Sequence, residues 1–253
     1  MVKYDQTQLI KLGIAQTTAT HTNEEGIKQA SQLLERLGKN EADIVCLPEQ
    51  YLSDNKIDDF EATLAPFSKI AKQYSMSIIA GAFYTKSGTK QTISAPVIDG
   101  TGQIIGMQDK IHPFDYENDS IKPGTEAKIF STKCKFGIVI CYDMVFSDVA
   151  ETLVKKGAEV LFSPARIVRR GIHPWHLYCQ TRALENRIPI LAANTQTPKF
   201  GGKSIIIDLE ENDGVMIPKT KITVGQGIRL ESFDLGKYEN ARKIRYSDHR
   251  KFS

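Results

Sequence analysis

The chain has 253 residues, of which 41% are apolar and 25% are charged, and its formal net charge is +3. This composition is ordinary for a globular protein of one large domain or two small ones. The weak, scattered positive charge argues against nucleic acid as a partner. No apolar run approaches the ~20 residues of a transmembrane helix, which argues against a membrane-spanning protein.

The N-terminus and the cysteines indicate the cellular compartment. Residues 1–6 lack the long apolar stretch of a secretory signal peptide. The cysteines show neither Cys-x-x-Cys spacing nor histidines at zinc-binding spacing, so we expect free thiols and no metal site. Reduced thiols are the rule in the cytoplasm, so we predict a cytoplasmic protein. The four cysteines are Cys46, Cys134, Cys141 and Cys179.

Strand-like and helix-like segments alternate along the chain, which predicts an α/β fold. Apolar residues at helical spacing predict helices at 22–38, 62–74, 147–156 and 175–187, the last with Leu177, Thr181, Leu184 and Ile188 down one side. Runs rich in β-branched residues predict the strands. These runs are 9–15, 43–47, 76–83, 103–110, 138–140, 160–163, 190–194, 203–208 and 227–234. Turn residues at 87–90 and 99–102 predict tight connections between antiparallel strands.

Three of these strands end in residues that are able to carry chemistry. The run 137–140 leads directly into Cys141, the run 43–47 into Pro48-Glu49, and the run 103–109 into Lys110. A strand end holds a side chain on a rigid scaffold, which suits a reacting group. A thiol, a carboxylate and an amine delivered in this way form a constellation suited to covalent acyl transfer. We therefore predict Cys141 as the nucleophile, Glu49 as the general base and Lys110 as the cation beside the developing oxyanion.

The same residues resemble the nitrilase superfamily of carbon–nitrogen hydrolases. Smaller matches follow in the order typical of the superfamily, from about residue 10 to about residue 235. The resemblance implies a four-layer α-β-β-α sandwich, a Glu-Lys-Cys catalytic triad and no metal or organic cofactor. We accordingly expect a single carbon–nitrogen hydrolase domain over residues 1–253, with a charged C-terminal extension from about residue 236. The main motifs are Leu47-Pro48-Glu49, Lys110-Ile111-His112 and Ile140-Cys141-Tyr142-Asp143.

Three further residues are candidates for the site. By resemblance, Glu117 corresponds to a second glutamate that orients the lysine and the substrate. Tyr142 follows the nucleophile, so its backbone N–H is suited to be a second oxyanion donor. Arg166 lies in a basic loop that walls the pocket in relatives. Its guanidinium suits a substrate carboxylate, although a solvated loop explains it equally well.

Several polar residues near these motifs are assigned structural roles. A buried carboxylate such as Asp143 needs a partner. Arg182 and Glu185 are three residues apart on the predicted helix and are expected to pair. His112 is interpreted as part of the local loop structure.

The expected reaction is hydrolysis of the carboxamide of a small aliphatic molecule, which gives an acid and ammonia through a thioester. Tyr142-Asp143 after the cysteine resembles the amidase-type branches, because the nitrile-specific branch usually carries Trp-Glu there. N-carbamoyl amide hydrolysis and nitrile hydrolysis remain alternatives. An alternative of another class is a non-catalytic binding or ammonia-transfer protein, against which the intact triad argues.

The resemblance also implies self-association. Superfamily members commonly pair as dimers across the helices near the nucleophile, and some assemble further. The matching segments are 147–156 and 175–187. We therefore expect a homodimer or a higher homo-oligomer, with a small amide or related molecule as the other partner.

Overall fold

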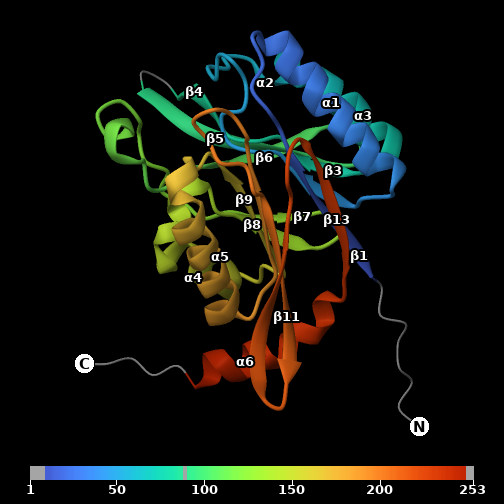
Figure 1. The fold of residues 1–253 in the computed structure, drawn as a ribbon, viewed down its shortest axis with the longest axis vertical. Coiled ribbons are helices and arrows are strands. Elements are labelled where there is room, and N and C mark those ends of the chain that lie inside the picture. The colour runs from blue at the N-terminus through green and yellow to red at the C-terminus, as the bar shows by residue number, and fades with distance from the viewer. Residues whose placement is uncertain (1–8, 88–89, 249–253) are drawn as a thin grey trace.

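The computed structural model describes residues 9–87 and 90–248, and two β-sheets form its centre (Figure 1). The first sheet has the order β13-β1-β2-β3-β5-β4, and β6 pairs with β5. Strands β1, β2 and β3 run parallel, whereas β13, β5 and β4 join by antiparallel pairing. The strands of this sheet are β1 (Ile10–Gln16), β2 (Ile44–Cys46), β3 (Ser77–Ile79), β4 (Phe83–Ser87), β5 (Lys90–Ile98), β6 (Ile104–Asp109) and β13 (Gly227–Phe233).

The second sheet has the order β12-β11-β10-β9-β8-β7. Its central strands β8, β9 and β10 are parallel, and antiparallel strands flank them on both sides. Both sheets thus have a parallel centre whose strands end at one edge. The strands are β7 (Ile129–Ser131), β8 (Lys135–Ile138), β9 (Val160–Ala165), β10 (Ile190–Asn194), β11 (Ile205–Asn212) and β12 (Val215–Ile222).

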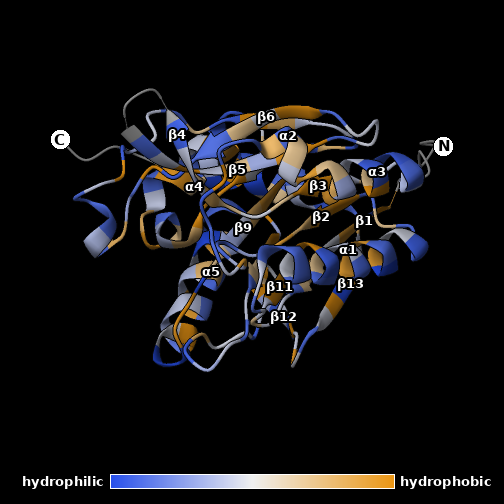
Figure 2. Cartoon of the chain, turned by 90° about the horizontal axis from the view of Figure 1, so that it is seen from above, coloured by the Kyte–Doolittle hydropathy of each residue, from blue (hydrophilic) through white to orange (hydrophobic). Residues whose placement is uncertain are grey.

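Helices cover the outer face of each sheet and complete four layers. Figure 1 shows α1 and α3 on one side of the strands and α4 and α5 on the other. One apolar cluster lies between the two sheets, and separate clusters lie beneath each helix pair, which confirms the predicted α-β-β-α sandwich. In Figure 2 helix α1 carries both apolar and polar colours, as expected for a helix with one face on a sheet. The helices are α1 (Asn23–Lys39), α2 (Phe60–Thr63), α3 (Ala65–Tyr74), α4 (Ser147–Lys155), α5 (Ile172–Asn186) and α6 (Glu239–Ser247).

Local signals explain several of these elements. The side chain of Thr22 caps α1 by accepting a hydrogen bond from the Glu25 backbone N–H. The turn predicted at 99–102 joins β5 and β6, where the Asp99 carboxylate accepts bonds from the backbone N–H groups of Thr101 and Gln103. The other predicted turn falls on residues 88 and 89, which lie outside the described residues.

The predicted strand at 76–83 is wrong as a single element. Strand β3 ends at Ile79, and β4 begins only at Phe83. Between them Gly81 has φ +101, and a Cβ there would lie 2.4 Å from the Pro48 carbonyl oxygen. The chain breaks here because the backbone must pass closely behind the segment that carries Glu49.

The stripe predicted on the helix at 175–187 does not mark the face that α5 buries. Leu177 is 50% exposed, whereas α5 buries Trp175, Cys179, Ala183 and the polar Arg182. Because polar side chains occupy the inner face, apolar periodicity does not identify it.

No run was predicted for β7 or β12, and β5 was expected only as the strand between the two predicted turns. Strand β12 is mostly exposed and contains Pro218, which a strand at the edge of a sheet tolerates.

The helices of residues 9–87 and 90–248 are too short or too polar to span a membrane.

Candidate active site

A buried ion cluster lies where the predicted triad segments meet. Lys110 Nζ is 2.9 Å from Glu49 Oε1 and 2.9 Å from Glu117 Oε2, and the three side chains are 1%, 3% and 4% exposed. Cys141 is partly exposed and lines the same pocket as all three. The structure therefore brings together the four residues predicted to be catalytic, which come from four separate segments of the chain.

Glu49 is held in place where the two sheets meet. Its backbone N–H donates to the Ala165 carbonyl, 3.3 Å away at the end of β9. The next residue, Gln50, has φ +45, and its N–H donates to the Ala82 carbonyl at 2.9 Å. Glu49 thus lies on a backbone turn that contacts both sheets.

Lys110 follows β6 and is fixed on both sides of its peptide. Its N–H donates to the Ile93 carbonyl, and its own carbonyl accepts from Gly124, both at 2.7 Å. A Cβ on Gly124 would lie 2.7 Å from the Asp109 carbonyl oxygen, so only glycine fits this approach. Glu117 is anchored in turn, because its Oε2 also accepts a 2.7 Å bond from the Phe114 N–H.

Cys141 opens a short 3₁₀ turn over Cys141–Val145. Two residues separate it from the end of β8 at Ile138, so the strand predicted at 138–140 ends earlier than expected. Cys141 has φ +46, a conformation that costs a non-glycine residue on the order of 1–3 kcal/mol and that clusters at functional sites. The buried Asp143 ties this turn to the Lys110 segment. Its carboxylate accepts from the N–H groups of Ile111 at 3.3 Å and His112 at 2.7 Å, and its Oδ1 lies 3.0 Å from His112 Nδ1.

Arg182 holds the same turn from α5. Its guanidinium donates to the carbonyls of Met144 at 3.2 Å and Val145 at 2.7 Å. The predicted pair with Glu185 is confirmed at 2.6 Å. Both Asp143 and Arg182, predicted as structural residues, therefore support the turn that carries Cys141.

The charges in the cluster affect the pKa values of the lysine and the cysteine in different ways. Burial lowers the pKa of Lys110, but Glu49, Cys141 and Glu117 together outweigh it and raise this pKa well above its usual value. Burial, with Glu49 nearby, raises the pKa of the Cys141 thiol well above its usual value, although Lys110 lowers it. Both directions favour a charged lysine and a protonated thiol.

The pocket beside the cluster has a volume of about 480 Å³. Besides Lys110, its lining combines aromatic rings with three further cations. It also includes both predicted substrate-binding residues, Tyr142 and Arg166. Tyr142 packs edge-on against Phe114 at 5.0 Å between ring centroids. The rings are Phe114, Tyr116, Tyr142, Trp175, Tyr178 and Phe200, and the cations besides Lys110 are Arg166, Arg170 and Lys199.

Arg166 has a neutral partner. Its Nη1 donates to Gln50 Oε1 at 2.6 Å, and its guanidinium carbon lies 4.2 Å from the centroid of the Phe200 ring. Within the described part of the chain no carboxylate forms an ion pair with it. The sequence analysis missed Gln50 and Phe200, and no local signal marks either residue, because both contacts join distant segments.

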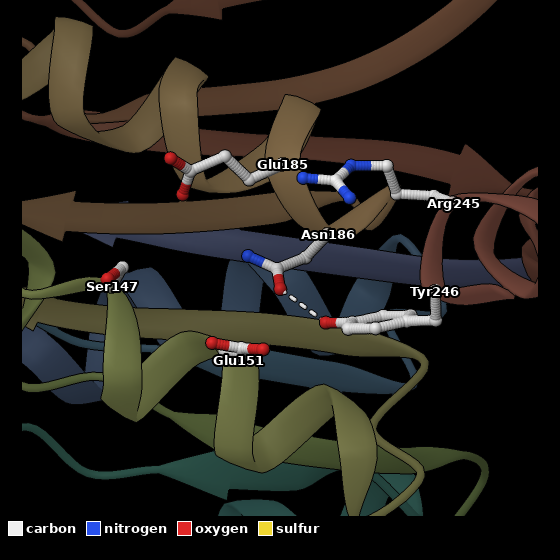
Figure 3. A pocket seen from close by; sticks show the side chains of 6 residues that line it. All are labelled: Ser147, Glu151, Glu185, Asn186, Arg245 and Tyr246. Atoms are coloured by element: carbon white, nitrogen blue, oxygen red, sulfur yellow. Dashed lines mark hydrogen bonds between the residues drawn. The ribbon is translucent and has the colours of Figure 1, made fainter. Parts of the chain in front are cut away.

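A second, smaller pocket of about 160 Å³ lies between α4, α5 and α6 (Figure 3). It contains none of the predicted site residues. Tyr246 reaches across it from α6 and donates a 2.6 Å hydrogen bond to Asn186 Oδ1 on α5.

Among the described residues, no group of three or more His, Cys, Asp or Glu side chains is arranged to hold a metal ion.

Comparisons with known proteins identify the family. The family model for carbon-nitrogen hydrolases matches residues 11–234. An omega-amidase, NIT2 of Xenopus tropicalis, is 27% identical over 203 residues, which cover 73% of this chain and 74% of the relative. A carbon-nitrogen hydrolase structure from Helicobacter pylori G27 superposes with a TM-score of 0.82 at 22% identity and covers 97% of each chain.

A further structural neighbour is an amidase from Nesterenkonia sp. AN1. The TM-score is 0.75 at 16% identity, over 96% of this chain and 97% of the neighbour. In that structure, a Glu-to-Gln variant carries the acetamide moiety of fluoroacetamide covalently bound to its active-site cysteine. The family match covers most of the sequence, and both sheets and both helix layers agree with the structural neighbours. The chain belongs to the carbon-nitrogen hydrolases of the nitrilase superfamily.

Proposed function

We propose that the protein hydrolyses the carboxamide of a small aliphatic substrate through a thioester on Cys141. The observation that carries this proposal is the buried Lys110, held between Glu49 and Glu117 in the pocket that Cys141 lines. A carboxylate, a fixed cation and a thiol beside one cavity are the groups that covalent acyl transfer requires. The adduct on the cysteine of the Nesterenkonia amidase supports the same assignment.

In the proposed cycle, Glu49 takes the proton of Cys141 and the thiolate attacks the amide carbon. Lys110 and the backbone N–H of Tyr142 stabilise the negative oxygen of the tetrahedral intermediate. The carbon–nitrogen bond breaks, and the nitrogen leaves as ammonia with the proton that Glu49 returns. Glu49 then takes a proton from water, which attacks the thioester carbonyl. Collapse of this second intermediate breaks the carbon–sulfur bond, releases the acid and returns the proton to Cys141.

The cations of the pocket favour a substrate that carries a carboxylate away from its amide. Arg166 has a neutral partner in Gln50 and no acidic one in the described chain, and Arg170 and Lys199 line the same cavity. A guanidinium binds a carboxylate through two parallel hydrogen bonds. The omega-amidases among the relatives agree with an amide at the end of an aliphatic chain.

The test is ammonia release from matched substrates. Succinamate and butyramide have the same chain length, and only succinamate carries a carboxylate; an N-carbamoyl compound and a nitrile complete the panel. We expect the highest kcat/KM with succinamate. Faster turnover of the nitrile or the N-carbamoyl compound would replace the amidase assignment. A folded protein that releases no ammonia from any of them would favour a binding or ammonia-transfer role.

We also propose that the chain forms a homodimer through α4 and α5. Leu177 and Tyr178 on α5 are 50% and 38% exposed, so this helix presents apolar surface beside the pocket. Light scattering should give twice the chain mass, and Leu177→Glu should shift it toward the monomer. An unchanged mass for this variant would exclude this face as the interface.

A further inference from the structure

Gln50 occupies an unusual position between the general base and the pocket arginine. It is 3% exposed, follows Glu49 directly and adopts φ +45. Its backbone N–H is bound to the Ala82 carbonyl at 2.9 Å, so the backbone cannot move freely. Its side chain therefore leaves a fixed point and reaches Arg166, 116 residues further along the chain, at 2.6 Å.

The contact orients Arg166 without neutralising it. A guanidinium has five N–H donors and no acceptor, so the group facing it must be the Gln50 oxygen. One donor is used on Gln50, and Nε is buried without a hydrogen-bond partner in the described structure. The guanidinium carbon lies over the Phe200 ring, 4.2 Å from its centroid. A glutamate at position 50 would form the same bond but would also pair its charge with the arginine.

We propose that Gln50 is a specificity-determining positioning residue, which aims the Arg166 guanidinium and keeps its charge available for the substrate's carboxylate. This inference rests on the proposed function. A neutral residue at position 50 makes the site selective for anionic amides, whereas an acidic residue there removes the selectivity. Gln50 affects the substrate through Arg166. Although it follows Glu49 in the sequence, it takes no part in the proton transfers proposed for Glu49.

The test measures the ratio of kcat/KM for succinamate to kcat/KM for butyramide. Gln50→Glu should lower this ratio about tenfold or more, because charge-assisted bonds to a carboxylate are the strong ones. Gln50→Met removes the orienting bond but adds no charge, so its loss should be smaller. Arg166→Met should bring the ratio close to one, and Gln50→Glu combined with Arg166→Met should lower it no further. Gln73→Glu, on the exposed side of α3, is the matched charge control.

Each outcome separates the two proposals. If Arg166→Met lowers the ratio and Gln50→Glu leaves it unchanged, the role of Gln50 is overturned and the substrate class stands. If Arg166→Met keeps the wild-type ratio, Arg166 does not bind the carboxylate and the proposed substrate class fails at this residue. Should Gln50→Glu prove inactive, calorimetry on the Cys141→Ala background gives the same ratio as dissociation constants for the two amides. Equal ratios with Gln or Glu at position 50 would again overturn the inference.

Discussion

The two charged regions of the pocket differ in how their charges are compensated. Lys110 is buried between two carboxylates of the protein itself, at 2.9 Å each. Arg166 is partly exposed and has a neutral amide and an aromatic ring as its partners. A charge paired within the protein is part of a preorganised site, whereas an unpaired charge at a cavity favours a ligand of opposite sign. In the proposed function, the first region carries the chemistry and the second selects the substrate.

The largest effect should come from Cys141→Ala, which removes the nucleophile and leaves both charged regions intact. Loss of a covalent nucleophile costs several orders of magnitude in rate, so we expect turnover to fall by about 10⁴-fold or more. The melting temperature should change little. Ammonia release and thermal unfolding measure the two quantities. Cys134→Ala, away from the pocket, is the control, and activity above about a tenth of wild type in Cys141→Ala would refute the mechanism.

Lys110→Gln breaks the paired region directly. We expect kcat to fall by about 10²–10³-fold with a smaller change in KM, because the cation acts on charge that develops in the transition state. Without the lysine, two buried carboxylates face each other, which should cost about 3–5 kcal/mol of stability. Steady-state kinetics and urea denaturation test both expectations. The control is Lys11→Gln, which removes the exposed pair with Glu41 and should cost far less stability than Lys110→Gln.

Asp143→Asn tests how the paired region is aligned with the nucleophile. Both oxygens of Asp143 accept hydrogen bonds from the segment after Lys110, so an amide at this position sets a donor against a donor. A misplacement of about 1 Å costs on the order of 10²-fold in rate, so kcat should fall by about 10–100-fold while KM changes little. Asp148→Asn, on the exposed start of α4, is the control. A fall in stability alone, with kcat preserved, would leave Asp143 a purely structural residue.

Arg166→Met should show the opposite balance from Lys110→Gln. The substitution removes a hydrogen bond and a contact with Phe200, so the loss of stability should be about 1 kcal/mol. Urea denaturation of the two variants side by side measures the contrast. Equal losses of stability would mean that Arg166 is as firmly built into the fold as Lys110, and the distinction between the two regions would fail.

The smallest effect concerns pH and His112. Its hydrogen bond to Asp143 raises the pKa of His112, against the opposing effect of burial. A raised pKa in the folded state stabilises the fold below the unfolded value of ~6.5, and this stabilisation is lost as the pH rises through the folded-state pKa. The difference in unfolding free energy between wild type and His112→Gln should therefore be larger near pH 5.5 than near pH 8.5, by less than ~1 kcal/mol.

The local pattern of the chain was sufficient to predict most strands and the residues at their ends. Glu49, Lys110 and Cys141 follow runs of β-branched residues, and a strand end is a local feature that neighbouring residues specify. The four layers followed from the resemblance, because the alternation of strands and helices by itself predicts only an α/β fold. The inner face of α5 could not be predicted, because Arg182 and Asn186 lie on it for the hydrogen bonds they make. Strand β12 was not predicted, because an edge strand needs no alternation of apolar and polar residues.

The amino-acid sequence by itself determined which groups are available for catalysis and the strand ends that carry them. Only the tertiary structure decided two further sets of contacts: Asp143 on the backbone of Ile111 and His112, and Gln50 on Arg166. Both sets join residues 31 or more positions apart, where periodicity carries no information. Whether a buried charge is neutralised or left available depends on which groups the fold places beside it, because hydrogen bonds form only at about 3 Å and charge pairing is strongest at that distance.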